Sequence, residues 1–273
     1  EQRIADVRRA GKLRPRALIG VDLFGQPADW PALRSIATRE DLFTLDDLAQ
    51  SFGCTLHGRP LGAAADATAT SFFPSKPLGA YGDGGALFTE SDERAALYRS
   101  LRTQGEGTTR YEVLRTGMNG RLDTMQAAVL LAKLTVFPEE LAAREQIARY
   151  YDARLGNAVA IPARVPDSTS AWAIYAILLR DAAERGDVQA SLKAAGVPTA
   201  IYYPRPLHRP PDGPVGMQRY RPADSIVERL RVVGRKDHPH RRARAQSGLI
   251  GVDDGIGQRA GQRHHRHAAI AQR

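Results

Sequence analysis

The chain has 273 residues, of which 42% are hydrophobic and 25% charged, so it can bury the core of one large domain or of two modest ones. Its single cysteine excludes a disulfide framework, and no apolar run approaches the roughly 20 residues that a membrane-spanning helix needs, so we expect a cytoplasmic protein without membrane association. The formal net charge of +9 comes entirely from the C-terminal part of the sequence. Residues 1–204 include 24 basic and 24 acidic residues, whereas residues 205–273 include 15 basic and 6 acidic residues. This placement argues against a nucleic-acid-binding fold.

Strands and helices are predicted to alternate through the first 209 residues, because short apolar runs alternate with longer segments of helical periodicity. Alternation of this kind is typical of an α/β fold. The expected strands are 17–24, 42–45, 70–73, 86–89, 171–179 and 199–203. The expected helices are 29–38, 92–103, 123–134, 138–155 and 188–195.

The last segment, 210–273, has a different composition. It is rich in Arg, Gly, Gln and His, and Tyr220 is its only aromatic residue. Only 224–233 has the pattern of a helix, so we expect a basic, disordered tail, or the product of a shifted reading frame in a GC-rich gene. The histidines near the end of this segment lack the spacing of a metal site.

The segment 70–86, TSFFPSKPLGAYGDGGA, contains the strongest candidate for a catalytic residue in the sequence. Lys76 follows a predicted strand and lies between two prolines and a glycine-rich loop, which would hold its amine in a fixed direction. A lone lysine is usually a solvated surface charge, but a rigidly held amine is a candidate nucleophile. The spacing of YGDGGA matches neither a P-loop nor a dinucleotide-binding fingerprint.

Four segments together resemble the DegT-type nucleotide-sugar aminotransferases, which use pyridoxal phosphate. They are LFTLDDLAQSFG, TSFFPSKPLGAYGDGGA, GMNGRLDTMQAAVLLAKL and AIYYPRPLH, in the order of the family. The resemblance implies a partial aspartate-aminotransferase-like fold (PLP fold type I). On this basis residues 1–136 form part of a large PLP-binding domain, residues 137–209 form a smaller C-terminal α/β domain, and the resemblance ends near Arg209.

The resemblance also implies roles for residues around the cofactor. Lys76 would hold pyridoxal phosphate covalently and relay protons during the reaction. Asp47 would face the pyridine nitrogen and keep it protonated, although the neighbouring Asp46 is an alternative and either acid could be a solvated strand end. Gln50 would lie near the ring, and the Ser71 hydroxyl would bind the cofactor phosphate.

Three further residues match substrate-side or interface positions of the family. Asn119 would reach the cofactor phosphate across a homodimer interface, and Arg121 would bind the acidic sugar nucleotide, since a guanidinium pairs well with carboxylate or phosphate oxygens. His208 would lie on the substrate side. The alternative for Arg121 is an ordinary surface salt bridge.

The expected activity is transfer of an amino group from an amino acid, glutamate by preference, to a keto nucleotide sugar for surface polysaccharide or O-antigen synthesis. The sequence of residues 71–86 most resembles that of enzymes that aminate a 3-oxo UDP-N-acetylglucosaminuronic acid. Some relatives are dehydratases in which histidine replaces the lysine, and the presence of Lys76 argues against that branch. Family members begin with a further N-terminal portion that holds the cofactor phosphate at a helix N-terminus, so cofactor binding by this chain should be weaker. The alternative is an inactive remnant whose basic tail binds polyanions nonspecifically.

Overall fold

The computed structural model describes residues 1–109, 111–203 and, as backbone, 230–233. The chain divides into two compact units, one containing residues 1–176 and the other beginning at Ile177. The domain boundaries expected from the sequence, at 136/137 and 209/210, stay predictions.

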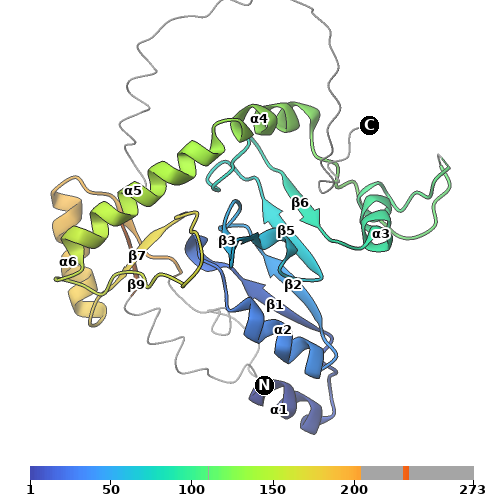
Figure 1. Cartoon of the computed structure of the whole chain (residues 1–273), viewed down its shortest axis with the longest axis horizontal. Helices are drawn as coiled ribbons and strands as arrows, with labels where there is room; N and C mark the ends of the chain where they lie inside the picture. The colour runs from blue at the N-terminus through green and yellow to red at the C-terminus, as the bar shows by residue number, and fades with distance from the viewer. Residues whose placement is uncertain (110, 204–229, 234–273) are drawn as a thin grey trace, which may run out of the picture. The chain divides into compact units, whose positions relative to one another are not determined.

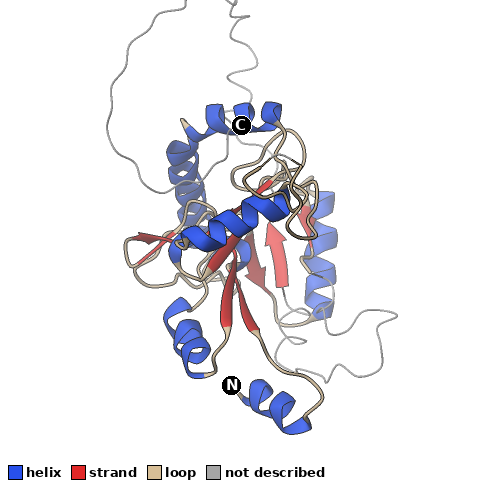
Figure 2. Cartoon of the chain, turned by 90° about the vertical axis from the view of Figure 1, so that its right-hand side faces the viewer, coloured by secondary structure: helices blue, strands red, loops and turns tan. Residues whose placement is uncertain are grey.

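A mixed four-stranded sheet forms the centre of the first unit and has the strand order β1-β2-β5-β6 (Figure 1). β1, β2 and β5 run parallel, whereas β6 pairs antiparallel with β5. Because parallel strands end at the same edge of a sheet, residues that follow β1, β2 and β5 come together there. The strands of this sheet, drawn red in Figure 2, are β1 (Ala17–Val21), β2 (Phe43–Asp47), β5 (Ala67–Ser71) and β6 (Gly85–Phe88). A short hairpin of β3 (Thr55–Leu56) and β4 (Arg59–Pro60) follows β2.

The helices of the first unit begin largely where the sequence predicts. Side chains of Asp29, Ser91 and Asp123 accept hydrogen bonds from backbone N–H groups in the first turns of α2, α3 and α4, and this capping fixes the three starts. Of the helices in the described part of the chain, none combines the length and apolar character needed to cross a bilayer. The helices are α1 (Gln2–Ala10), which the sequence reading missed, α2 (Trp30–Arg39), α3 (Asp92–Arg102), α4 (Thr124–Leu134) and α5 (Phe137–Leu155).

The strand expected at 171–179 is shorter than predicted, since β7 spans only Tyr175–Leu178. The preceding backbone is used elsewhere: Ala171 N donates to Gly25 O at 2.9 Å, Ile174 N donates to Phe24 O at 3.3 Å, and Trp172 has a left-handed φ of 43°. The apolar character of 171–174 therefore reflects burial against the turn after β1 and not strand pairing.

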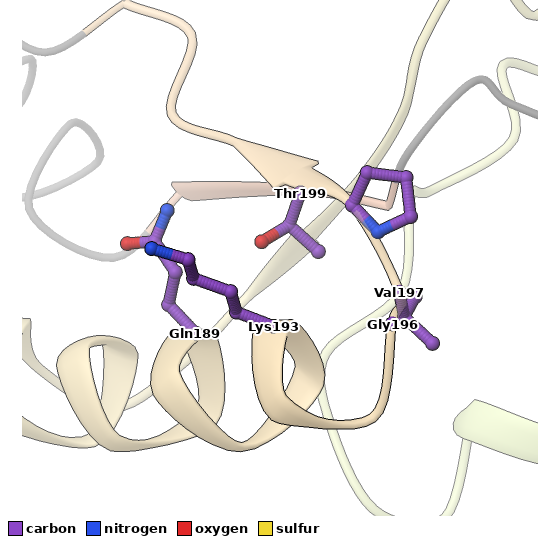
Figure 3. Close-up of a pocket in the computed structure, with 6 residues that line it drawn as sticks. Gln189, Lys193, Gly196, Val197 and Thr199 are labelled. Carbon is purple, nitrogen blue, oxygen red and sulfur yellow. The ribbon is translucent and has the colours of Figure 1, made fainter.

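The second unit contains α6 (Ala182–Ala194), β8 (Thr199–Ala200) and β9 (Leu230–Val233). β8 and β9 pair antiparallel, so the helix expected over 224–233 is wrong for its last four residues. The two adjacent valines there favour an extended backbone over a helix. A cavity of about 360 Å³ at the end of α6 is lined by residues between Gln189 and Thr199, and its described lining includes no predicted site residue (Figure 3).

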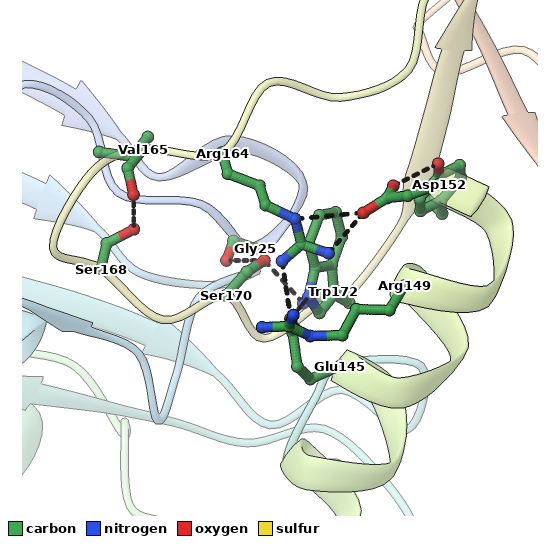
Figure 4. A network of polar contacts seen from close by, with 10 residues as sticks. Gly25, Glu145, Arg149, Asp152, Arg164, Val165, Ser168, Ser170 and Trp172 are labelled. Carbon is green, nitrogen blue, oxygen red and sulfur yellow. Dashed lines mark hydrogen bonds and ion pairs between the residues drawn. The ribbon is translucent and has the colours of Figure 1, made fainter. Parts of the chain in front are cut away.

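A polar network ties α5 to the loop that precedes β7 (Figure 4). Arg164 forms ion pairs with Glu145 at 2.8 Å and with Asp152 at 2.6 Å, and its guanidinium lies over the Trp172 ring, 5.0 Å from the centroid. Trp172 Nε1 in turn donates to Glu145 at 2.6 Å. The loop is thus fixed to the helix by one arginine that contacts three partners.

Replacing Arg164 with alanine is expected to destabilise the protein by about 1–2 kcal/mol, because three coupled contacts are lost from a partly exposed network. Urea denaturation measures this effect. The loss should shrink in high salt, where ion pairs are screened. Removing Arg180, which in the described part of the chain forms an ion pair with Glu184 on the surface, serves as the control and should leave the urea unfolding curve nearly unchanged.

Candidate functional site

Asp47 and Ser71 lie on one face of the sheet, at the edge where β2 and β5 end. The register pairs Val21 with Asp47 and Asp47 with Ala69, and Ser71 is two residues beyond Ala69 on the same face of β5. Val21 is 47% exposed, so this face is open to a bound molecule. The Asp47 carboxylate and the Ser71 hydroxyl thus lie on one open surface. The side chain of Ala69, which is next to both residues on this surface, is small.

Lys76 lies in the turn that follows β5, and its side chain is half-buried. Its backbone N donates to Phe73 O at 2.8 Å, and Ala80 N donates to Phe72 O at 2.7 Å, so the turn closes on itself. Leu78 and Ala80 are 3% and 1% exposed and anchor the turn in an apolar cluster with Phe72. The backbone around Lys76 is thus fixed by hydrogen bonds and buried neighbours, and the direction of its amine stays a prediction.

Two residues of helix α4 contact the C-terminal part of this turn, at Gly79 and Tyr81. Lys133 Nζ donates to the Gly79 carbonyl and lies 4.9 Å from the Tyr81 ring centroid, and Gln126 Oε1 accepts from Tyr81 N at 2.8 Å. The segment from Lys76 to Tyr81 is therefore held from the sheet side and from the helix side.

The turn after β1 is bonded directly to the segment that contains Asp47 and Gln50. Asp22 N donates to Asp47 O at 3.1 Å, and Phe24 N donates to Gln50 Oε1 at 2.6 Å. Ser51 Oγ donates to the Asp22 carbonyl at 2.6 Å. Gln50 thus uses its acceptor oxygen to hold the β1 turn.

Two acids beneath this turn, Asp22 and Asp46, are both 0% exposed. Burial, followed by the charge of Asp22, raises the pKa of Asp46 from its usual 3.8 to about 9, and burial also raises the pKa of Asp22. Asp46 therefore lies inside the protein and is not the solvated strand end considered as an alternative. Sequence reasoning missed Asp22 because the expected strand 17–24 included it, whereas β1 ends at Val21 and Asp22 begins the turn.

Gly25 closes the turn after β1 with a φ of 102°, and its carbonyl accepts from Ala171 N, Ser170 Oγ and Cys54 Sγ. A Cβ added at Gly25 would lie 2.7 Å from Trp172 N. Left-handed geometry and lack of space thus both require glycine here.

The Gly25→Ala substitution is expected to cost about 2–4 kcal/mol, because strain in φ adds to a clash with backbone atoms. Gly11→Ala is a matched control: Gly11 also has a left-handed φ, 67°, but nothing lies within 4 Å of an added Cβ. This control should cost only about 1–2 kcal/mol. Equal losses in thermal unfolding of the two variants would contradict the proposed crowding at Gly25.

The remaining predicted site residues are not part of the named sheet strands, and one of them lies outside the described residues. Asn119 and Arg121 are exposed on the segment between α3 and α4, where Asn119 forms an isolated bridge with Thr103. His208 falls outside the described residues, as do the histidines near residue 265. Within the described part of the chain, no group of three or more His, Cys, Asp or Glu side chains could hold a metal ion.

Comparison with known proteins connects this arrangement to one family. A model of the DegT/DnrJ/EryC1/StrS aminotransferase family matches residues 3–229, which extends past Arg209, where the resemblance was expected to end. The chain is 45% identical over 199 residues to the UDP-2-acetamido-2-deoxy-3-oxo-D-glucuronate aminotransferase of Pseudomonas aeruginosa, covering 72% of this chain and 54% of that protein. It is 37% identical over 207 residues to the dTDP-3-amino-3,4,6-trideoxy-alpha-D-glucose transaminase of Streptomyces venezuelae.

Solved structures give the same result. A DegT DnrJ EryC1 StrS aminotransferase from Brucella abortus superposes with a TM-score of 0.78 at 41% identity, covering 84% of this chain and 62% of that one. S. venezuelae DesV, solved in complex with a ketimine intermediate, has a TM-score of 0.76 at 34% identity and covers 83% and 62%. The chain spans about half the length of the curated relatives it matches. With a family match over most of its length and the corresponding fold, the chain belongs to the DegT/DnrJ/EryC1/StrS aminotransferase family.

Proposed function

We propose that this chain provides the lysine-bearing part of a pyridoxal phosphate-dependent transaminase that moves an amino group from glutamate to a keto nucleotide sugar. The observation that carries this proposal is the convergence of Asp47, Ser71 and the rigid Lys76 turn at one edge of the sheet. The match to named sugar transaminases supports it further.

The residues at this edge fit pyridoxal phosphate. The cofactor has a flat ring with a basic nitrogen, an aldehyde and a phosphate, and the open face offers a carboxylate, an amine and a hydroxyl for these groups. Ala69 pairs with Asp47 across the two strands and lies two residues before Ser71 on the same face of β5, and its small side chain leaves room for a ring above it. A bulky residue there would fill the face.

Each residue has a distinct task in this proposal. The Asp47 carboxylate would hold the protonated ring nitrogen, and the Ser71 hydroxyl would hold the phosphate. When bound, pyridoxal phosphate supplies the electron sink that allows the α-hydrogen of the donor to leave as a proton. Lys76 would be the residue that holds the cofactor through its amine, and the same amine, once free, would carry the proton that leaves the donor. The donor becomes a 2-oxo acid and the sugar ketone becomes an amine.

The finer assignments follow the Pseudomonas aeruginosa relative. We propose a UDP-linked 3-oxo uronic acid derivative as the acceptor, with Arg121 binding its anionic groups, and a role in surface polysaccharide or O-antigen synthesis in the cytoplasm. A homodimer, in which Asn119 and Arg121 serve the neighbouring site, is part of the same proposal. The names of these relatives favour an enzyme over a noncatalytic polyanion-binding remnant.

A single-turnover assay of the first half-reaction tests the function without the sugar. The protein is loaded with pyridoxal phosphate, mixed with glutamate, and the 2-oxoglutarate formed is measured. About one equivalent per chain supports the proposal, and alanine or aspartate in place of glutamate identifies the preferred donor. Folded, cofactor-loaded protein that produces no oxo acid from any amino acid would overturn it.

A further inference from the structure

The Asp22 and Asp46 carboxyl groups form a buried pair that the proposed reaction does not use directly. Gly20 pairs with Asp46 in the register of β1 and β2, so Asp22, two residues after Gly20, lies on the same face beside Asp46. Thr68 pairs with Asp46 from β5 on the other side. All three side chains are 0% exposed. The two carboxyl groups interact closely enough for each to act on the other's protonation.

The hydrogen bonds of this pair are incomplete. Asp22 Oδ1 accepts from Ala28 N at 2.8 Å and from Trp30 Nε1 at 3.0 Å, whereas Asp22 Oδ2, both Asp46 oxygens and the neighbouring Thr68 hydroxyl make no hydrogen bond with another described residue. Among the described residues, none of the ion pairs includes either acid. Two adjacent buried carboxylates with three unpartnered oxygens and no cation would repel strongly, and a proton between them removes one charge and supplies a donor to one of these oxygens.

Asp22 also connects the pair to the candidate site. Its backbone N donates to the Asp47 carbonyl, and its own carbonyl accepts from Ser51 Oγ. Phe24, two residues later, donates to Gln50. Movement of Asp22 would therefore shift both ends of the segment that presents Asp47.

We propose that Asp22 and Asp46 share one proton at neutral pH and that this acid–carboxylate pair is a positioning element that holds the Asp47–Ser51 segment in place for the cofactor. The sharing of the proton rests on the register, the burial and the unpartnered oxygens of the two acids, and it does not depend on the proposed function. The positioning role rests on the proposed function, because it concerns the residue that faces the pyridine nitrogen.

The pH dependence has a defined sign. The proton is held in the folded protein, whereas in the unfolded chain both acids ionise near their usual pKa of 3.8. Stability from the pair is therefore complete below about pH 4 and is lost as the pH rises toward the folded pKa of Asp46 near 9. Other titratable groups facing the pair are Asp47 on β2 and Cys54 in the following turn, while α2 and β5 contribute the uncharged Trp30 and Thr68.

The Asp46→Asn variant supplies the same hydrogen bond permanently from its amide, without a titrating proton. Between pH 5.5 and 7.5, urea denaturation should show the unfolding equilibrium constant of the wild type rising about tenfold per pH unit relative to Asp46→Asn. Groups common to both proteins cancel in this ratio. Infrared spectra at pH 7.5 should show a protonated carboxylic acid band in the wild type that Asp46→Asn lacks. The exposed control Asp41→Asn should keep both the band and the slope.

The positioning role is tested by rescue. Pyridoxal phosphate should dissociate from Asp46→Asn with a constant within about twofold of the wild type, whereas Asp46→Ala, which leaves Asp22 Oδ2 without a donor, should bind about tenfold more weakly. Equal binding by these two folded variants would overturn the positioning role. Absence of the infrared band and of the pH slope would overturn the shared proton. Failure of the wild type to bind the cofactor would instead count against the proposed function.

Discussion

Lys76→Ala is expected to abolish covalent capture of pyridoxal phosphate and to slow the glutamate half-reaction by about 10³-fold or more. The lysine amine is both the attachment point and the proton carrier, and an alanine side chain can supply neither. Because Lys76 lies in a turn held by backbone hydrogen bonds and by buried Leu78 and Ala80, the variant should fold normally. The measurement is the visible absorption of protein mixed with cofactor, together with the yield of 2-oxoglutarate.

A matched control is Lys12→Ala, which removes an exposed lysine in the segment between α1 and β1. This variant should retain both cofactor capture and the half-reaction. An unchanged absorption spectrum in Lys76→Ala would contradict the assignment of Lys76, whatever the behaviour of the control.

Trp30→Ala is expected to destabilise the first unit by about 3–5 kcal/mol, the largest loss of stability that we predict. Trp30 is 2% exposed, packs over Gly20 in the middle of β1, and donates from Nε1 to Asp22. The substitution removes a large apolar volume and also one of the two donors to Asp22 Oδ1. Chemical denaturation followed by circular dichroism measures the loss.

Trp30→Phe separates the two contributions. Phenylalanine retains most of the buried volume but lacks the N–H, so its loss should be about 1–3 kcal/mol. Leu13→Ala, at a position that is 75% exposed, should change stability by less than about 0.5 kcal/mol. Equal losses for Trp30→Ala and Trp30→Phe would mean that packing over Gly20 contributes nothing.

The sequence was sufficient to locate the elements whose ends carry clear local signals. The starts of α2, α3 and α4 coincide with the capping residues Asp29, Ser91 and Asp123, because capping depends on neighbours only a few positions along the chain. The strand predicted at 70–73 overlaps β5 (Ala67–Ser71) only at Thr70 and Ser71, whereas the turn at Lys76 lies where prolines and glycines limit the local backbone.

Features that depend on distant partners could not be predicted in the same way. Ala171 to Ile174 form an apolar run like a strand, but their backbone groups bond to Phe24 and Gly25, nearly 150 positions earlier in the chain. Asp22 and Asp46 become a pair only when β1 and β2 align in parallel. The strand at 230–233 likewise forms by pairing with Thr199 and Ala200.

The central claim is that Lys76, presented at the edge where β2 and β5 end, is the residue that holds pyridoxal phosphate. The chain has only five lysines, so chemical trapping can distinguish them. Protein mixed with the cofactor is reduced with borohydride, digested with trypsin and examined by mass spectrometry. We expect one modified peptide, which contains Lys76. Modification spread over Lys12, Lys133 and Lys193, or no modification of folded protein, would contradict it.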